Sequence, residues 1–209
     1  MGAVVALDDL LQQRRIWKAQ PTPLPPSAQP TGHAALDALL PTGGWPESAL
    51  SEILMPSEGV GELQLLWPTL ARLTRNAERV VLVAPPHVPY PQAWQVAGVD
   101  LRWLAIIQAC GRDALWATEQ CLRSGSCGAV LCWPQRADDR ALRRLQVAAE
   151  TGQTLAFAYR SLQEAINPFQ SVPGMDVIRC RAGPGASRWS QVFPGQWRGE
   201  GNGRCRGAG

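Results

Sequence analysis

The sequence predicts an α/β fold in which a mostly parallel sheet carries helices on both faces. Three runs of strand length are almost entirely apolar, at residues 79–84, 128–133 and 154–159, which is typical of strands buried on both sides. The main segments with helical spacing of apolar residues are 62–75, 113–123 and 138–150. Strands that alternate with helices in this way favour parallel pairing, with helices packed above and below the sheet.

Shorter elements complete the predicted core. Two further strands are expected at residues 49–54 and 101–107, and two further helices at 31–40 and 91–97. Residues 175–182 and 187–193 alternate apolar and polar side chains, which indicates an antiparallel hairpin at the sheet edge. Trp45, in a Gly-Gly-Trp-Pro turn, is expected to clamp that turn onto the domain, and the other tryptophans are expected mostly in the core.

The ends of the chain differ from this core, which we place at residues 31–194. Residues 1–19 form an arm whose predicted helix carries Leu7, Leu10, Leu11 and Trp17 on one face. A helix this short must bury its apolar stripe, either on its own domain or on a neighbouring molecule. Residues 20–30 hold five prolines in eleven positions and predict an extended, semi-rigid linker that holds the arm away from the core.

Charge is distributed unevenly along the chain. Lys18 is the single lysine among 20 basic residues, so a lysine-dependent mechanism has one candidate. From residue 179 onward, six arginines face one glutamate and give a net charge of +5, while the preceding residues sum to −2. These arginines are Arg179, Arg181, Arg188, Arg198, Arg204 and Arg206. A mildly acidic body predicts weak or absent DNA binding, whereas the basic end could contact an acidic protein or DNA.

Composition narrows the compartment and the chemistry. No window approaches the roughly 20 apolar residues of a membrane span, and the N-terminus reaches Asp8 and Asp9 too early for a signal peptide. We therefore expect a cytoplasmic protein whose six cysteines are reduced and mostly buried. The cysteines lack zinc-site spacing and the histidines are only His33 and His87, so no metal is expected. Residues 195–209, rich in Gly and Arg, predict a flexible tail.

A loop between the first predicted strand and its helix has the layout of a phosphate-binding loop, but its chemistry is degenerate. Gly59 and Gly61 supply the glycines, yet Glu62 and Leu63 follow where a lysine and a hydroxyl residue are needed. Glu62 would repel a triphosphate. It could act as a general base, for which no partner can be named, or stabilise a helix N-terminus, which we favour. No cofactor is expected.

A second part of a nucleotide site is also missing. Magnesium needs a carboxylate at the end of a later strand, but the strand at 128–133 ends in Trp133 and Pro134. A nucleophilic triad would have to use His33 or His87. His87 and Tyr90 lie in a proline-bounded surface loop, where a binding role is more plausible than catalysis.

Several motifs resemble the ImuA family, the RecA-like accessory proteins of bacterial translesion DNA synthesis. They lie at residues 31–46, 51–54, 59–63, 84–90, 97–101, 114–120 and 139–146. The resemblance spans roughly residues 4–182 and implies a RecA-like three-layer fold with a degenerate phosphate loop. The SulA cell-division inhibitor is related and shares the reduced core.

The resemblance implies an SOS-induced, non-catalytic protein of mutagenic lesion bypass. Its partners would be an ImuB-like adaptor polymerase, an error-prone replicative-type polymerase and RecA. The arm would correspond to the segment with which RecA-type proteins grip a neighbouring protomer, and the basic end to a partner-binding element. Two alternatives stay open: a SulA-like inhibitor of the tubulin-like division protein, against which the long arm weighs, and a residual ATPase.

Overall fold

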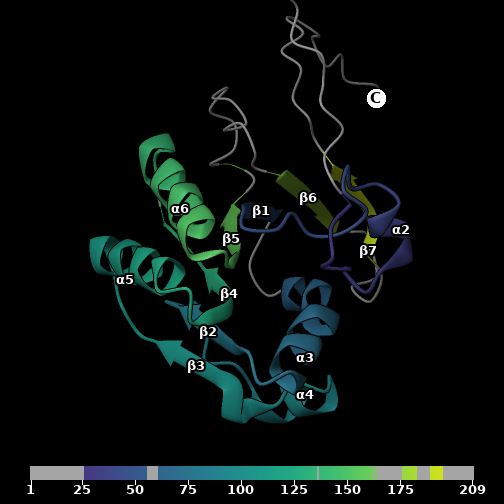
Figure 1. Ribbon diagram of the computed structural model, residues 1–209, viewed down its shortest axis with the longest axis horizontal. Coiled ribbons are helices and arrows are strands. Elements are labelled where there is room, and N and C mark those ends of the chain that lie inside the picture. Colours follow the sequence, from purple (N-terminus) through teal and green to yellow (C-terminus); the bar gives the residue numbers. More distant parts are fainter. Residues whose placement is uncertain are drawn as a thin grey trace, which may run out of the picture.

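A seven-stranded sheet forms the centre of the protein in a computed structural model (Figure 1). The structure describes residues 26–55, 61–135, 137–161 and 163, and the backbone of residues 176–182 and 189–194. The predicted arm, the first part of the linker, Gly59 and the predicted tail lie outside these residues.

The strand order is β3-β2-β4-β5-β1-β6-β7. The strands are β1 (Leu50–Met55), β2 (Arg79–Val83), β3 (Leu104–Ile107), β4 (Cys127–Cys132), β5 (Leu155–Ser161), β6 (Asp176–Ala182) and β7 (Trp189–Pro194). Strands β1 to β6 pair in parallel, and β7 runs antiparallel to β6 at one end of the sheet. The predicted parallel sheet and the antiparallel edge hairpin are both confirmed.

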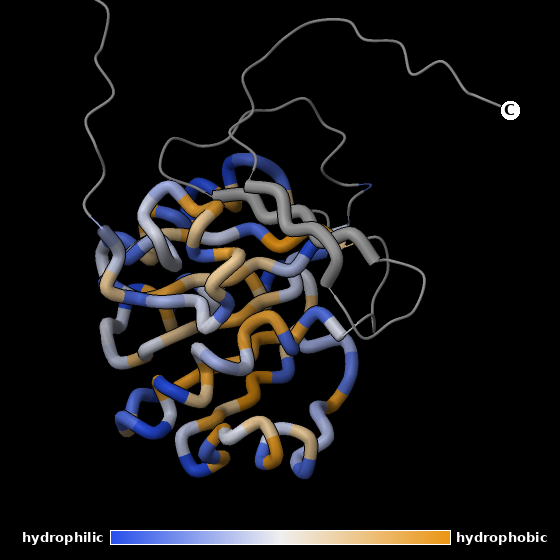
Figure 2. The backbone as a smooth tube through the Cα atoms, turned by 90° about the vertical axis from the view of Figure 1, so that its right-hand side faces the viewer, coloured by the Kyte–Doolittle hydropathy of each residue, from blue (hydrophilic) through white to orange (hydrophobic). Residues whose placement is uncertain are grey.

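Helices cover both faces of this sheet, as predicted (Figure 1). The helical elements are α2 (Ala34–Asp37), η1 (Glu62–Leu65), α3 (Trp67–Arg75), α4 (Pro91–Val96), η2 (Leu101–Trp103), α5 (Gly111–Arg123) and α6 (Asp139–Gly152). Each face of the sheet has its own hydrophobic cluster, and side chains of the buried strands point to both. Ile53 and Phe157 pack on the α3 side, and Leu50 and Ala156 pack on the α5–α6 side. Figure 2 shows this apolar interior in orange, with hydrophilic turns around it.

Three predicted elements differ in detail. The helix expected at 62–75 is divided, because Pro68, which has no N–H to donate, lies at the second position of α3. The strand expected at 101–107 begins as η2 and becomes β3 only at Leu104. Of the helix expected at 31–40, only α2 is helical, and turns complete the segment.

The last residues of the predicted linker lie against the core instead of holding a spacer away from it. Ser27 donates its N–H to the carbonyl of Thr42 at 2.8 Å, and Trp45 donates its N–H to the carbonyl of Gln29 at 2.8 Å. Gln29 also accepts a hydrogen bond from Arg72 of α3 at 2.7 Å. Backbone groups of a proline-rich segment still seek partners, and here the neighbouring turn supplies them.

Trp45 clamps its turn, as expected. The indole is fully buried, contacts Phe157 edge-on with a ring distance of 5.0 Å, and donates its N–H to the hydroxyl of Thr69 at 2.8 Å. Gly32 lies close to α3, the helix that also carries Thr69. Its φ of +84° is left-handed, and a Cβ there would lie 2.3 Å from Cβ of Pro68, so only glycine allows this close approach.

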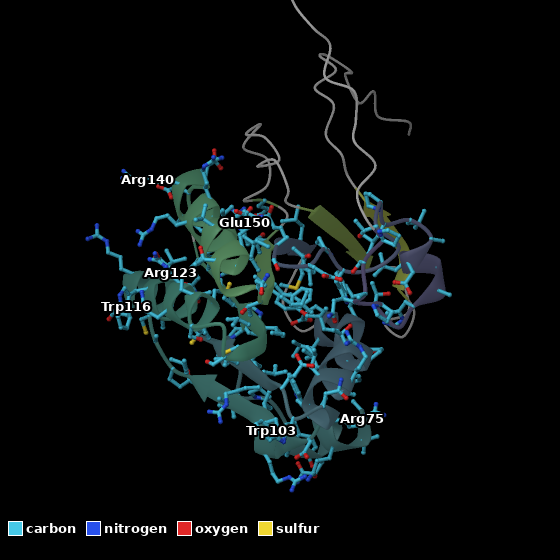
Figure 3. All side chains as sticks on the ribbon, in the orientation of Figure 1. Arg75, Trp103, Trp116, Arg123, Arg140 and Glu150 are labelled. Atoms are coloured by element: carbon cyan, nitrogen blue, oxygen red, sulfur yellow. The ribbon has the colours of Figure 1, made fainter. Side chains whose placement is uncertain are left out.

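Two expectations about individual side chains need correction. Trp116, expected in the core, is 62% exposed on α5, because its position falls on the outer face of that helix (Figure 3). Of the four cysteines with described side chains, Cys132 alone is buried, Cys121 and Cys127 are half-buried and Cys110 is exposed; all four are free thiols. Burial raises the pKa of Cys132 to about 12, which keeps this thiol protonated.

A buried ion pair joins neighbouring strands on the α5–α6 side of the sheet. Arg160 of β5 donates to the carboxylate of Glu52 of β1, and both side chains are almost fully buried. The guanidinium also donates to the carbonyl of Ala137 at 3.2 Å, just before α6. The pair therefore links two central strands to the start of a helix. Removing one partner of such a pair leaves a buried charge uncompensated.

We predict that Arg160→Met lowers the free energy of unfolding by about 3–5 kcal/mol, because Glu52 stays buried without its cation. Urea denaturation measures the loss. Arg102→Met, which removes the exposed pair with Asp100, is the matched control and should stay close to the wild type. The double variant Glu52→Met/Arg160→Met should recover much of the loss. Equal stabilities of Arg160→Met and Arg102→Met would contradict this role.

Candidate functional site

The candidate site lies where the neighbouring strands β4, β5 and β1 end. Ligands of open parallel sheets bind outside the carboxyl ends of the strands. The strand order β4-β5-β1 brings Trp133, which follows β4, and Tyr159 of β5 to the edge from which the chain leaves β1 toward Glu62. The structure thus brings together the degenerate loop and the end of the strand at 128–133, which are far apart in the sequence.

Gly61 and Glu62 form the described end of the degenerate loop. Gly61 has a left-handed φ of +82° and precedes η1, whose first residue is Glu62. Glu62 is only 6% exposed, and its place in the first turn fits the interpretation that it stabilises a helix N-terminus. Leu63 packs against the core cluster on the α3 side. Neither side chain supplies the cation or hydroxyl of a nucleotide site.

Two amide groups of the helical segment after Gly61 donate within the segment. The N–H of Gln64 donates to the carbonyl of Gly61 at 2.9 Å, and the N–H of Leu66 donates to the carbonyl of Leu63 at 3.0 Å. Pro68 has no N–H. A phosphate cradle needs a run of free N–H groups at a helix N-terminus. The amides of Gln64 and Leu66 are therefore not available to an anion.

Two aromatic rings occupy the ends of β4 and β5. Trp133 and Tyr159 stack with a ring distance of 5.0 Å and an angle of 11° between planes. The hydroxyl of Tyr159 donates to the carbonyl of Glu62 at 3.5 Å, and both rings are buried. The end of β4, where a carboxylate could hold magnesium, thus carries half of an aromatic pair. The sequence predicts Trp133 in the core but does not single out Tyr159, whose position beside Trp133 depends on the strand order.

A second feature is the free edge of the sheet at β3. Among the described residues, seven large hydrophobic side chains are exposed, and five of them belong to residues 88–116, which include α4, β3 and the start of α5. The five are Val88, Tyr90, Val96, Ile106 and Trp116. An exposed apolar edge strand is a template for pairing with another chain. The surface position predicted for Tyr90 is confirmed, whereas the exposure of Ile106 depends on β3 being an edge, which the sequence does not show.

The partner-binding residues predicted from sequence lie mostly outside the described part of the chain. This holds for Leu7, Leu10, Leu11, Trp17, Arg188, Arg198, Arg204 and Arg206. Arg179 and Arg181 belong to β6, where the backbone of Arg179 lies between Leu54 of β1 and Phe193 of β7. Within the described residues no group of His, Cys, Asp and Glu could hold a metal ion, and no helix could cross a membrane.

Known proteins with similar sequences are RecA proteins. The chain is 33% identical to RecA of Symbiobacterium thermophilum over 103 residues, which covers 49% of this chain and 29% of that protein. It is 34% identical to RecA of Chlorobaculum tepidum over 97 residues, 46% of this chain and 28% of that protein. The matches thus span less than a third of each RecA. No protein-family model matches the chain.

Among solved structures, SulA from Pseudomonas aeruginosa is similar to part of the chain. It is 27% identical, the match covers 54% of this chain and 97% of SulA, and the TM-score is 0.47. The α/β architecture described above, with its parallel sheet and helices on both faces, is consistent with a RecA-like domain.

We predict that Trp133→Ala lowers the free energy of unfolding by about 3–5 kcal/mol, because a buried indole and its stack on Tyr159 are lost. Trp116→Ala is the matched control: the same truncation at an exposed position should cost within about 0.5 kcal/mol. Urea denaturation of both variants provides the comparison. If the two losses were equal, the aromatic pair would not be a structural part of this edge.

Proposed function

We propose that this protein is a non-catalytic accessory protein of the DNA-damage response that acts through protein–protein contacts in translesion DNA synthesis. An ImuB-like adaptor polymerase is the proposed main partner, with RecA and an error-prone replicative-type polymerase as further partners. The observation that carries the proposal is the edge where β4, β5 and β1 end, in which Glu62 and a buried aromatic pair stand where a nucleotide site would need cations and a carboxylate.

The chemistry of this edge supports a protein that does not hydrolyse ATP. Phosphoryl transfer depends on cations that neutralise the developing charge, and the residues after Gly61 are Glu62 and Leu63. The ring of Trp133 replaces the group that would hold magnesium. A RecA-like core without this machinery is suited to binding partners.

Similarity to RecA supports a place in DNA-damage processes. The matches to RecA proteins cover about half of this chain, and the described sheet and helices provide a complete scaffold for contacts. The β3 edge supports the mode of action, because exposed apolar side chains beside an unpaired strand mark interaction sites. Trp116 is suited to be an anchor of such an interface, where tryptophan is enriched.

Nucleotide binding tests the non-catalytic part of the proposal. Titration of the protein with ATP and magnesium in a calorimeter should give no magnesium-dependent heat, because Glu62, Leu63 and Trp133 stand where a lysine, a hydroxyl residue and a carboxylate ligand are needed. A RecA protein serves as the positive control. A saturable, magnesium-dependent signal would overturn the proposal and favour a residual ATPase.

Partner binding tests the scaffold role. We expect the adaptor polymerase to bind the full chain, and Ile106→Lys/Trp116→Arg to weaken binding at least about tenfold by placing charge on the apolar β3 edge. Val147→Arg is the matched control, because Val147 is also an exposed apolar residue but lies on α6. Affinity is measured by pull-down and by titration of the labelled adaptor.

Two deletions test the terminal contacts separately. Removing residues 1–19 or 195–209 leaves β7 in place, so β6 keeps its neighbour. Either deletion should weaken adaptor binding if that end is a contact. Unchanged affinity in both deletions and in Ile106→Lys/Trp116→Arg would remove the interface assignment. Inhibition of polymerisation of the tubulin-like division protein by the purified chain would instead support the SulA-like alternative.

A further inference from the structure

The opposite edge of the sheet, where the parallel strands begin, carries a polar groove of about 750 Å³. Its lining includes residues at the starts of five neighbouring strands: Ser48, Arg79, Trp103, Cys127 and Leu155. Trp103, labelled in Figure 3, lies at the β3 end. From β3 to β1 the groove crosses four strand spacings, about 19 Å, which matches about six residues of extended chain.

Electrostatics favour a cationic occupant. Glu47 and Glu78 line the groove, against the single cation Arg79 among its lining residues. Helices α3, α5 and α6 all end at this edge, immediately before β2, β4 and β5, so the negative ends of their dipoles face it. Glu78 lies directly over the start of β4: a Cβ at Gly128 would be 2.7 Å from its Oε2.

The turns that shape the groove contain non-glycine residues in the left-handed backbone conformation. Ser48, Ala77 and Gln153 have positive φ values of 54°, 61° and 49° and all line it. Each turns the chain sharply into the following strand, where glycine would be the easier residue. Non-glycine residues in this conformation cost free energy and cluster at functional places. The groove is thus bounded by defined turns.

We propose that the groove is the docking site of this chain's own Gly/Arg segment, residues 195–209. Strand β7 runs toward this edge, and Pro194 is level with Ile178 of β6 and hence with Ile53 of β1. The near end of the groove lies at Ser48, five residues before Ile53 along the chain, and β1 is two strand spacings from β7. Pro194 is therefore about 20 Å from Ser48. The segment carries Arg198, Arg204 and Arg206 against Glu200, so its charge is complementary to the groove.

The reach of the segment places Arg204 and Arg206 beside Glu78. Cys205 is 11 residues beyond Pro194, and 11 extended residues span about 36 Å. Cys127 is at the start of β4, which is two strand spacings from β1 on the side away from β7. Its distance from Pro194 is therefore about 30 Å. Arg204 and Arg206 would pair with the carboxylates, and the glycines around them allow the backbone to approach closely. Cys205 would then lie next to Cys127.

Docking of this kind has a regulatory consequence. Exposed ion pairs are individually weak, but a tethered segment has an effective concentration on the order of millimolar, so the groove would be occupied without holding the segment tightly. A partner that needs the same arginines must compete with the groove. Docking itself does not depend on the partner proposed above, because it requires this chain alone.

The native thiols test the proposal. Mild oxidation of the purified Cys121→Ala variant with diamide, which accepts the two electrons and two protons released when two thiols form a disulfide, is followed by peptide mapping of the monomer. We expect the Cys127–Cys205 disulfide to exceed Cys110–Cys205 by at least about fivefold. Cys110 is the internal control: it is the more exposed thiol, but it precedes α5 at the opposite edge of the sheet.

Charge variants decide whether the groove holds the segment. Glu78→Gln and Arg204→Gln/Arg206→Gln should each lower the yield of Cys127–Cys205 several-fold, whereas Asp113→Asn, at the opposite edge, should leave it unchanged. Equal yields at Cys110 and Cys127, or a yield indifferent to these charges, would overturn the proposal. Disulfides found only in dimers would place the segment in the groove of a second copy and would also overturn it.

Discussion

The position of β1 between β5 and β6 is the constraint on which the rest of the structure depends. All six residues of β1 are buried, so its polar side chains need partners inside the protein. Glu52 has Arg160 of β5, and the backbone N–H of Leu50 donates to Gln146 of α6 at 2.7 Å. These contacts fix α6 and β5 relative to β1. They thereby fix which side chains meet at each edge of the sheet.

The carboxyl edge follows directly from this arrangement. Because β5 separates β1 from β4, the ring of Tyr159 lies between the segment at Glu62 and the ring of Trp133, and it contacts both. A carboxylate in place of Trp133 would be buried against an aromatic neighbour without a cation, which is costly. Packing thus accounts for the aromatic residue at this position: Trp133 and Tyr159 complete the core at the ends of β4 and β5.

The sequence was sufficient for the layers, the parallel strands and the edge hairpin, because continuous apolar runs and alternating runs differ in period. The degenerate loop stays a prediction, because only Gly61, Glu62 and Leu63 of its residues 59–63 are described. The sequence could not show that Trp116 is exposed, because a shift of one residue along a helix turns a side chain by about 100° and can move it from the buried face to the exposed face. The Trp133–Tyr159 stack and the exposure of Ile106 depend on strand order, which is a property of the fold and not of any local pattern.

The two edges of the sheet consequently have different roles. At the carboxyl edge, the rings of Trp133 and Tyr159 are buried against each other. At the opposite edge, Glu47, Glu78 and the ends of three helices give a polar groove of negative character. The proposed accessory role requires surfaces that other chains can recognise. The apolar β3 edge and the acidic groove are two such surfaces of opposite chemistry, so one can bind an apolar partner while the other holds a basic segment.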